Sequence, residues 1–170
     1  LIYFDGLTNI HNRRYLEFQG EKWVKEAVDR KDRLYCAIFD IDEFKRINDQ
    51  IGHIAGDEAI KNIAILLREN IEENMMCARY GGDEFVIVIP ADNYDRIDGI
   101  LEDIRQIFAK PWFLKDADYY CTMSMGIVTF PHGEDTVQDL IKKADIAMYE
   151  AKKTGKNRMA KYSDSLESTS

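Results

Sequence analysis

The sequence predicts a layered α/β or α+β domain, because helical and strand-like patterns alternate along its 170 residues. Two apolar runs, residues 34–39 and 85–89, have the length and the uninterrupted hydrophobicity of buried strands. Other segments place apolar residues at helical spacing. The length corresponds to one domain that is large enough to bury a substantial core.

The N-terminal part is predicted to form a helix, a strand and a second helix. Thr8 and Asn9 offer capping chemistry for a helix at residues 12–29. A strand at residues 33–40 follows and leads into a short helix at residues 43–50. The unpaired N–H groups at the start of this short helix suit a phosphate group.

A turn and a long helix are expected next. Gly52 and Gly56 bracket the turn, and Asp57 is in a position to cap the helix. We expect this helix to pack on the sheet through one apolar face. The residues of that face are Ile60, Ile63, Ala64, Leu67 and Ile71.

Glycines join two apolar runs into a predicted β-hairpin. Residues 75–78 precede the turn and residues 85–89 follow it. We expect Gly81-Gly82 to supply the positive φ angles that a tight turn demands. Asp83 and Glu84 then lie at the tip of the hairpin.

From residue 97 on, the alternation of helices and strands continues. Pro111, Pro131-His132-Gly133 and Gly155 are the stop signals between these elements. The expected elements are a helix over positions 97–108, a strand at 119–130, a helix at 137–153, an edge strand at 158–162 and a disordered polar tail at 163–170.

A second acidic site gives the hairpin acids a chemical interpretation. Asp40 ends the first predicted strand, and it lies beside Asp83 and Glu84 if the two strands are neighbours in one sheet. Mg²⁺ takes oxygen ligands and is usually shared with substrate phosphates. The residues therefore outline a phosphoryl- or nucleotidyl-transfer site, although acids beside glycines also occur in ordinary polar turns.

The composition excludes several classes of protein. A formal net charge of −8 at pH 7 argues against non-specific binding to nucleic acid or to an anionic membrane, since both depend on clustered cations. No apolar run approaches the roughly 18 residues of a membrane span. Because the first residue is Leu1, we expect a piece of a longer protein, with an upstream sensory or regulatory region outside this chain.

The cysteines and histidines do not predict a disulfide or a zinc site. The cysteines are odd in number and lie in apolar runs, which favours buried, reduced thiols in a cytoplasmic protein. The histidines lack metal-ligand spacing. These residues are Cys36, Cys77 and Cys121, and His11, His53 and His132.

Motifs spread over nearly the whole chain match one known family in its order. Besides the hairpin, they occupy residues 5–14, 40–48, 51–57, 124–127 and 144–158. On these motifs the chain resembles the GGDEF domain of diguanylate cyclases, whose namesake stands here as Gly81-Gly82-Asp83-Glu84-Phe85. We assign residues 1–162 to this domain.

The resemblance implies a fold and an activity. The family has a central, mostly antiparallel five-stranded sheet flanked by helices, similar to the palm of nucleotidyl cyclases and polymerases. A diguanylate cyclase joins two GTP molecules into cyclic di-GMP and releases two pyrophosphates. One domain holds one GTP, so a second GGDEF domain is the expected partner. We expect a cytoplasmic domain without nucleic-acid or membrane contacts, whose parent protein could still be membrane-anchored.

The same resemblance assigns the metal site. Asp40, Asp83 and Glu84 would be carboxylate ligands for Mg²⁺ or Mn²⁺, and the carbonyl of Ile41 would be a further oxygen ligand. Asp83 could instead act as general base on the 3′-hydroxyl, so Asp83 and Glu84 are the expected catalytic residues. We interpret the side chains of Asp42 and Glu43 as surface acids.

The resemblance also implies three groups of substrate contacts. Phosphates would be bound by backbone amides at the start of the short helix, by a lysine in the same helix and by two lysines near the end of the last helix. A pair of polar side chains would read the guanine base. Lysines at a helix C-terminus are also favoured by the helix dipole alone. The phosphate-binding amides are those of Glu43, Phe44 and Lys45, the lysines are Lys45, Lys152 and Lys156, the guanine readers are Asn48 and Asp57, and His53 lines the pocket.

One departure from the family concerns regulation. Many members carry an Arg-x-x-Asp site for product inhibition, and the corresponding residues here are Glu72 and Met75. We therefore expect no feedback inhibition through that site. The alternative to an active cyclase is a non-catalytic GTP-binding module that regulates a neighbouring domain. A product receptor is a weaker alternative, because it needs the missing site.

Overall fold

The computed structural model describes residues 2–90, 96–109, 111–114, 117–130 and 136–167. Helices and strands alternate along most of these residues, as the sequence predicts. The strands are β1 His11–Asn12, β2 Leu34–Ile41, β3 Met76–Arg79, β4 Glu84–Pro90, β5 Pro111–Leu114, β6 Ala117–Tyr120, β7 Met123–Phe130 and β8 Arg158–Lys161. The helices are α1 Arg13–Arg30, α2 Phe44–Ile51, α3 His53–Asn70, α4 Ile97–Phe108, α5 Val137–Lys153 and α6 Asp164–Glu167.

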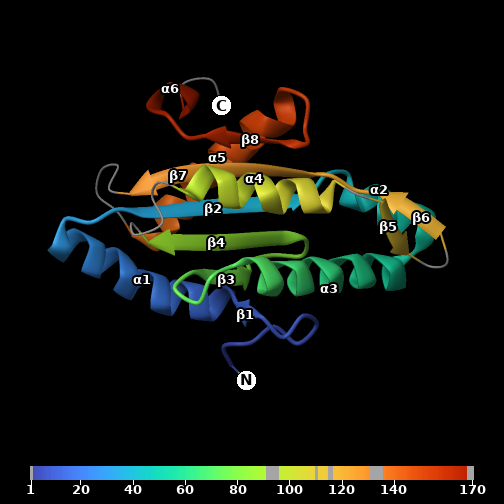
Figure 1. Cartoon of the computed structure of the whole chain (residues 1–170), viewed down its shortest axis with the longest axis horizontal. Coiled ribbons are helices and arrows are strands. Elements are labelled where there is room, and N and C mark those ends of the chain that lie inside the picture. Colours follow the sequence, from blue (N-terminus) through green and yellow to red (C-terminus); the bar gives the residue numbers. More distant parts are fainter. Residues whose placement is uncertain (1, 91–95, 110, 115–116, 131–135, 168–170) are drawn as a thin grey trace.

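A mixed sheet lies at the centre of the fold (Figure 1). Within the described residues, six strands pair in the order β1-β3-β4-β2-β7-β8. The four inner strands pair in antiparallel fashion, whereas the edge strands β1 and β8 run parallel to β3 and β7. The predicted α+β class is confirmed, but the sheet has one strand more than the expected five, because the two residues of β1 extend it beyond β3.

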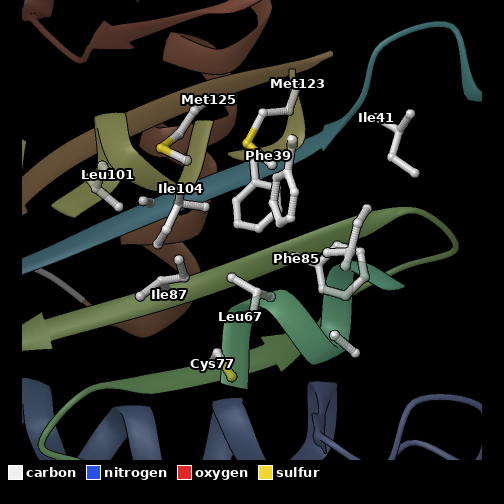
Figure 2. Close-up of a cluster of buried hydrophobic side chains, with 14 of the residues drawn as sticks. Phe39, Ile41, Leu67, Cys77, Phe85, Ile87, Leu101, Ile104, Met123 and Met125 are labelled. Atoms are coloured by element: carbon white, nitrogen blue, oxygen red, sulfur yellow. The ribbon is translucent and has the colours of Figure 1, made fainter. Parts of the chain in front are cut away.

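Helices cover both faces of the sheet, because successive strand residues point to opposite sides. Cys36 and Ile38 of β2 face α1 and α5, whereas Ala37 and Phe39 face α3 and α4. Figure 2 shows the second cluster, where the rings of Phe39 and Phe85 stack with 5.6 Å between their centroids. Each strand of the sheet centre therefore stabilises two cores.

Close backbone packing sets the position of α5. A Cβ atom at Gly126 of β7 would lie 2.0 Å from the carbonyl oxygen of Ala144 and 2.2 Å from the backbone nitrogen of Met148. Only glycine therefore allows α5 to rest directly on the strand. At the other end of α5, Thr136 and Asp139 form a capping box.

The segment predicted as one strand at residues 119–130 is divided. Residues 117–120 form β6, which pairs with β5 in a separate two-stranded sheet, and residues 123–130 form β7 of the main sheet. This hairpin lies at one end of the molecule beside α2 (Figure 1), where the Tyr119 hydroxyl donates to Gln50 Oε1 at 2.9 Å. The hydrophobic pattern of residues 119–130 does not show where one strand ends and the next begins, because both strands have the composition of a strand. The predicted stop at residues 131–133 lies outside the described residues.

Two predicted helix caps are wrong. Asn12 caps α1, since its side chain accepts a hydrogen bond from the backbone nitrogen of Tyr15, whereas Thr8 bonds to Asp5 in the preceding loop. Asp57 does not cap α3, because that helix already begins after Gly52. Gly52 has φ of 93°, so the chain turns there and not at Gly56.

The C-terminal segment differs from the expected disordered tail. Residues Asp164–Glu167 form the short helix α6, and residues 168–170 lie outside the described part. A single helical turn carries too weak a local signal to be predicted from eight polar residues. The edge strand β8 and the stop of α5 before Gly155 are confirmed.

Two further predictions concern the core and the membrane. Cys36, Cys77 and Cys121 are buried and free, as expected, and burial raises the pKa of the Cys36 thiol to about 12. None of the helices in the described ranges is both long and apolar enough to cross a membrane.

The packing at Gly126 makes a testable prediction. We expect Gly126→Ala to lower the free energy of unfolding by about 3 kcal/mol, because the added methyl group would push α5 away from β7. Gly99→Ala in α4 is the control, since no atom lies within 4 Å of the added methyl group there. It should leave stability unchanged or raise it by about 1 kcal/mol. Equal urea denaturation midpoints for the two variants would contradict this account.

Candidate active site

The register of the sheet brings the predicted acids together. Asp40 of β2 pairs with Glu84 of β4 on one side and with Ser124 of β7 on the other. Residues that pair across antiparallel strands lie on the same face, so Asp40 and Glu84 share the face covered by α1 and α5. Asp83 precedes Glu84 at the end of the hairpin loop. The register therefore places Asp40 beside Glu84 at one end of the sheet, with Asp83 next to Glu84 in the chain, as the sequence predicts.

The hairpin loop is held in a way that the sequence analysis did not foresee. Residues 80–83 connect the strands, and neither Gly81 nor Gly82 has a positive φ angle. The prediction of positive φ is wrong, because a loop longer than two residues does not need the mirror-image turn of the shortest hairpins. Instead, Arg79 donates to the carbonyl oxygen of Gly82 at 2.7 Å and pairs with Asp5 at 3.2 Å. Within the described residues, nothing lies within 4 Å of a Cβ atom placed at Gly82, so the loop is open on that side.

Asp40 is the most constrained of the acids. Its Oδ2 accepts a hydrogen bond from Lys152 Nζ at 2.5 Å, and only 10% of its side chain is exposed. Its Oδ1 is buried and, within the described part of the chain, has no hydrogen-bond partner. A buried carboxylate oxygen without a partner is costly and is the kind of group that a cation stabilises.

Burial makes the charged form of the acids unfavourable in the absence of a ligand. It raises the pKa of Asp40 to about 6 although Lys152 lowers it, and the charge of Asp83 raises it further. Burial also raises the pKa values of Asp83 and Glu84. Asp145 of α5 adds to the shift of Glu84, and its own pKa is raised by burial. A bound cation would lower the pKa values of all four acids again.

The acids fit a divalent cation in chemistry but not yet in arrangement. Among the described residues, no group of three or more His, Cys, Asp or Glu side chains is gathered closely enough to hold a metal ion. The ammonium group of Lys152 instead occupies one oxygen of Asp40. The free Oδ1 of Asp40 and the carboxylates of Asp83 and Glu84 are hard oxygen donors that suit Mg²⁺ or Mn²⁺. Ile41, the fourth predicted ligand, is buried at the end of β2.

The segment after β2 presents backbone amides to the same site. Glu43 adopts the left-handed conformation, with φ of 56°, and precedes the first turn of α2. In the described part of the chain no side chain caps this helix, so no capping group binds the amides at Phe44 and Lys45. The side chains of Glu43 and Lys45 are exposed. The interpretation of the Glu43 side chain as a surface acid is confirmed.

The predicted guanine-reading residues are brought together by a helix contact. A Cβ atom at Gly56 would lie 2.0 Å from Asn48 Oδ1, so the amide group of Asn48 packs directly on α3. Asp57 follows Gly56 in the chain and is exposed. Asn48 and Asp57 therefore present polar groups from adjacent helices. His53 is the first residue of α3 and is also exposed.

Two of the three predicted lysines, Lys152 and Lys156, approach the junction of β2 and α2 from the C-terminal part of the chain. Lys152 lies near the end of α5 and pairs with Asp40, and Lys156 Nζ lies 3.8 Å from Glu43 Oε1 in the following loop. The helix dipole also favours Lys152 at this end of α5. The end of α5 and the loop after it therefore place one lysine beside Asp40 and another beside the start of α2.

The interpretation of Asp42 as a surface acid is wrong, and the sequence did not single out Asp145. Asp42, interpreted as a surface acid, is buried and accepts hydrogen bonds from Thr122 and Ser124 at 2.6 Å each. Its position two residues after Asp40 was the available signal, because residues at that spacing in an extended chain share a face. Asp145 lies within a motif of the resemblance, but nothing in the sequence indicated its influence on Glu84.

A comparison with known families shows the family of this chain. Residues 2–158 match the family described as "Diguanylate cyclase, GGDEF domain", which is nearly the whole chain. The chain belongs to the GGDEF domain family. The resemblance inferred from the motifs is thus confirmed.

Curated relatives of this GGDEF domain come from several bacteria. A diguanylate cyclase from Vibrio cholerae is 36% identical over 164 residues, which cover 96% of this chain and 50% of the relative. The diguanylate cyclase DgcP from Pseudomonas aeruginosa is 38% identical over 156 residues, which cover 91% of this chain and 23% of DgcP. The chain therefore spans half or less of the length of these two relatives.

Solved structures have the same fold as this GGDEF domain. A truncated TpbB from Pseudomonas aeruginosa that comprises only the GGDEF domain superposes with a TM-score of 0.91 at 30% identity and covers 98% of each chain. The GGDEF domain of DgcB from Caulobacter crescentus, solved in complex with c-di-GMP, gives a TM-score of 0.87 at 30% identity, covering 94% of this chain and 92% of that one.

The ion pair between Lys152 and Asp40 makes a second prediction. We expect Lys152→Met to tighten the binding of Mn²⁺ to the nucleotide-free domain by about fivefold, because the cation no longer competes with the ammonium group for Asp40. Isothermal titration calorimetry with Mn²⁺ alone measures this affinity. Lys153→Met is the matched control, since Lys153 pairs with Glu150 and not with an acid of the site. Unchanged or weaker Mn²⁺ binding in Lys152→Met would show that the lysine does not compete.

Proposed function

We propose that this GGDEF domain is a diguanylate cyclase that condenses two GTP molecules into cyclic di-GMP and releases two pyrophosphates. The observation that carries the proposal is the convergence, at one end of the sheet, of Asp40 and Glu84 with the start of α2 and with Lys152. Carboxylates, free amides and a cation are together the groups that a nucleoside triphosphate and its metal require.

Each part of the site has a proposed role. The backbone amides of Glu43, Phe44 and Lys45 and the ammonium groups of Lys152 and Lys156 bind the phosphates of GTP. Asn48 and Asp57 read the guanine base, because a carboxylate accepts from both N1–H and the 2-amino group, which adenine cannot offer together. His53 lines the edge of this pocket.

The reaction forms one oxygen–phosphorus bond for each one it breaks. The 3′-hydroxyl of one GTP attacks the α-phosphate of the other, the bond from that phosphorus to the bridging oxygen breaks, and pyrophosphate leaves. Asp83 accepts the proton of the 3′-hydroxyl, which its raised pKa favours. Asp40, Glu84 and the carbonyl of Ile41 would hold a divalent cation, with Asp83 as a further ligand in the alternative to its role as base, and that cation would neutralise charge at the phosphates.

The product sets a requirement for two domains. Cyclic di-GMP has two equivalent halves and one GGDEF domain holds one GTP, so two domains must face each other for both attacks. We propose a homodimer of GGDEF domains as the active species. We also propose that the domain acts in the cytoplasm.

Turnover of GTP tests the proposal. We expect the domain to convert GTP and Mg²⁺ into cyclic di-GMP, identified by mass, at a rate that rises more steeply than linearly with protein concentration. Asp83→Asn should lower this rate by at least about a hundredfold, because it removes the base and keeps the shape. Asp103→Asn, at an exposed position of α4, should not change it. GTP that is bound but never converted, even at high protein concentration, would favour the non-catalytic regulatory module.

A fourth prediction concerns Glu72 and Met75, which stand where many family members carry the Arg-x-x-Asp inhibitory site. Glu72 is paired with Arg96 at 2.8 Å, and Met75 is buried, so neither offers a free cation or a free acid to a nucleotide. We propose that the enzyme lacks product inhibition through these residues. Adding cyclic di-GMP to the same assay at up to about a hundred times the protein concentration should leave the initial rate within about twofold. Strong inhibition that Glu72→Ala abolishes would overturn this proposal.

A further inference from the structure

The hydrogen bonds of Asp42 connect three separate segments. Oδ1 accepts from the Ser124 hydroxyl at 2.6 Å, and Oδ2 accepts from the Thr122 hydroxyl at 2.6 Å and from the backbone nitrogen of Asn157 at 3.0 Å. The backbone nitrogen of Asp42 donates to the carbonyl oxygen of Thr122 at 2.8 Å. One carboxylate thus ties the end of β2 to the start of β7 and to the loop after α5.

That loop is strained and carries Lys156. Gly155, Lys156 and Asn157 have φ angles of 135°, 63° and 46°. For lysine and asparagine this conformation is unfavourable and persists only where surrounding contacts hold it. Asp42 supplies one such contact, and Arg105 supplies another by donating to Asn157 Oδ1 at 2.6 Å.

Asp42 also adjoins the other phosphate-facing element. The next residue, Glu43, has the left-handed backbone that starts α2, and its carboxylate lies 3.8 Å from Lys156 Nζ. The bonds of the Asp42 side chain therefore help to hold the amides at the start of α2 and the Lys156 loop in place relative to each other.

The carboxylate of Asp42 is buried and is held by neutral groups. The residue is 7% exposed, and among the described residues no lysine or arginine forms an ion pair with it. Its three donors are neutral hydroxyl and amide groups. A buried carboxylate is costly unless hydrogen bonds satisfy it, as these three do, and the negative charge of Asp42 also raises the pKa of Asp40. Only a carboxylate offers two acceptor oxygens to these three donors, because an amide side chain has one acceptor oxygen and would turn its NH2 group toward one of them.

We propose that Asp42 is a positioning residue for the nucleotide, which acts by holding the Lys156 loop in its strained conformation against the start of α2. This inference rests on the proposed function, since it assumes that Lys156 binds the phosphates of GTP. Asp42 itself does not touch the nucleotide, and its effect on binding passes through Lys156.

A double-mutant cycle tests this route. The binding of a thio-substituted GTP analogue in Mg²⁺ is measured by calorimetry for the starting protein, Asp42→Asn, Lys156→Met and the double variant. We expect each single variant to bind about tenfold more weakly and the double variant to bind no more weakly than Lys156→Met, because the two residues act as one unit. A double variant that is weaker by about a hundredfold, with additive effects, would overturn the inference. Asp29→Asn, at an exposed position of α1, is the control.

Circular dichroism shows whether Asp42→Asn folds, and a second variant tests the inference if it does not. Thr122→Val removes the hydroxyl that shares Oδ2 with Asn157 and leaves the charge in place. It should weaken binding by about threefold in the presence of Lys156 and have no effect in Lys156→Met. An equal loss in both backgrounds would overturn the inference. If the starting protein converts GTP but the cycle is additive, only the role of Asp42 fails, whereas no binding by the starting protein overturns the proposed function as well.

Discussion

The close approach of α5 to β7 is the constraint on which the candidate site depends. At Gly126 the helix backbone lies where any other residue would place its Cβ atom. The capping box at Thr136 defines the start of the helix, and the contact at Gly126 fixes its distance from the sheet. The last turn of α5 therefore passes over the end of β2, where Lys152 reaches Asp40. A looser contact would separate the cation from the acids that it stabilises.

Burial of acids at the end of a sheet opposes folding, and this site concentrates several of them. The pKa values of Asp40, Asp83, Glu84 and Asp145 are all raised, which means that the folded protein disfavours their charged forms. Lys152 offsets part of this cost for Asp40, whose second oxygen has no hydrogen-bond partner in the described chain. Such unfavourable arrangements are typical of functional sites, where a ligand completes what the protein leaves unsatisfied.

Several errors in the sequence-based predictions have one cause, which is competition between local signals. Asp57 and Thr8 are good capping residues, but Gly52 and Asn12 lie closer to the points where the chain changes direction. Gly81-Gly82 suggested a tight turn, yet a longer loop closed by Arg79 removed the need for positive φ. In each case the residue types do favour caps or turns. The position of the cap or turn depends on other residues nearby, which the predictions did not take into account.

The sequence by itself determined the family, the nature of the acids and lysines, and most of the helices and strands, because motifs and periodic patterns act over short stretches of chain. Only the tertiary structure decided the strand order, the parallel edge strands and the burial of Asp42. Lys152 and Asp40 are separated by 112 positions, and Asn157 and Asp42 by 115. Contacts at such separations follow from how helices and sheet pack together, which no local pattern in the chain specifies.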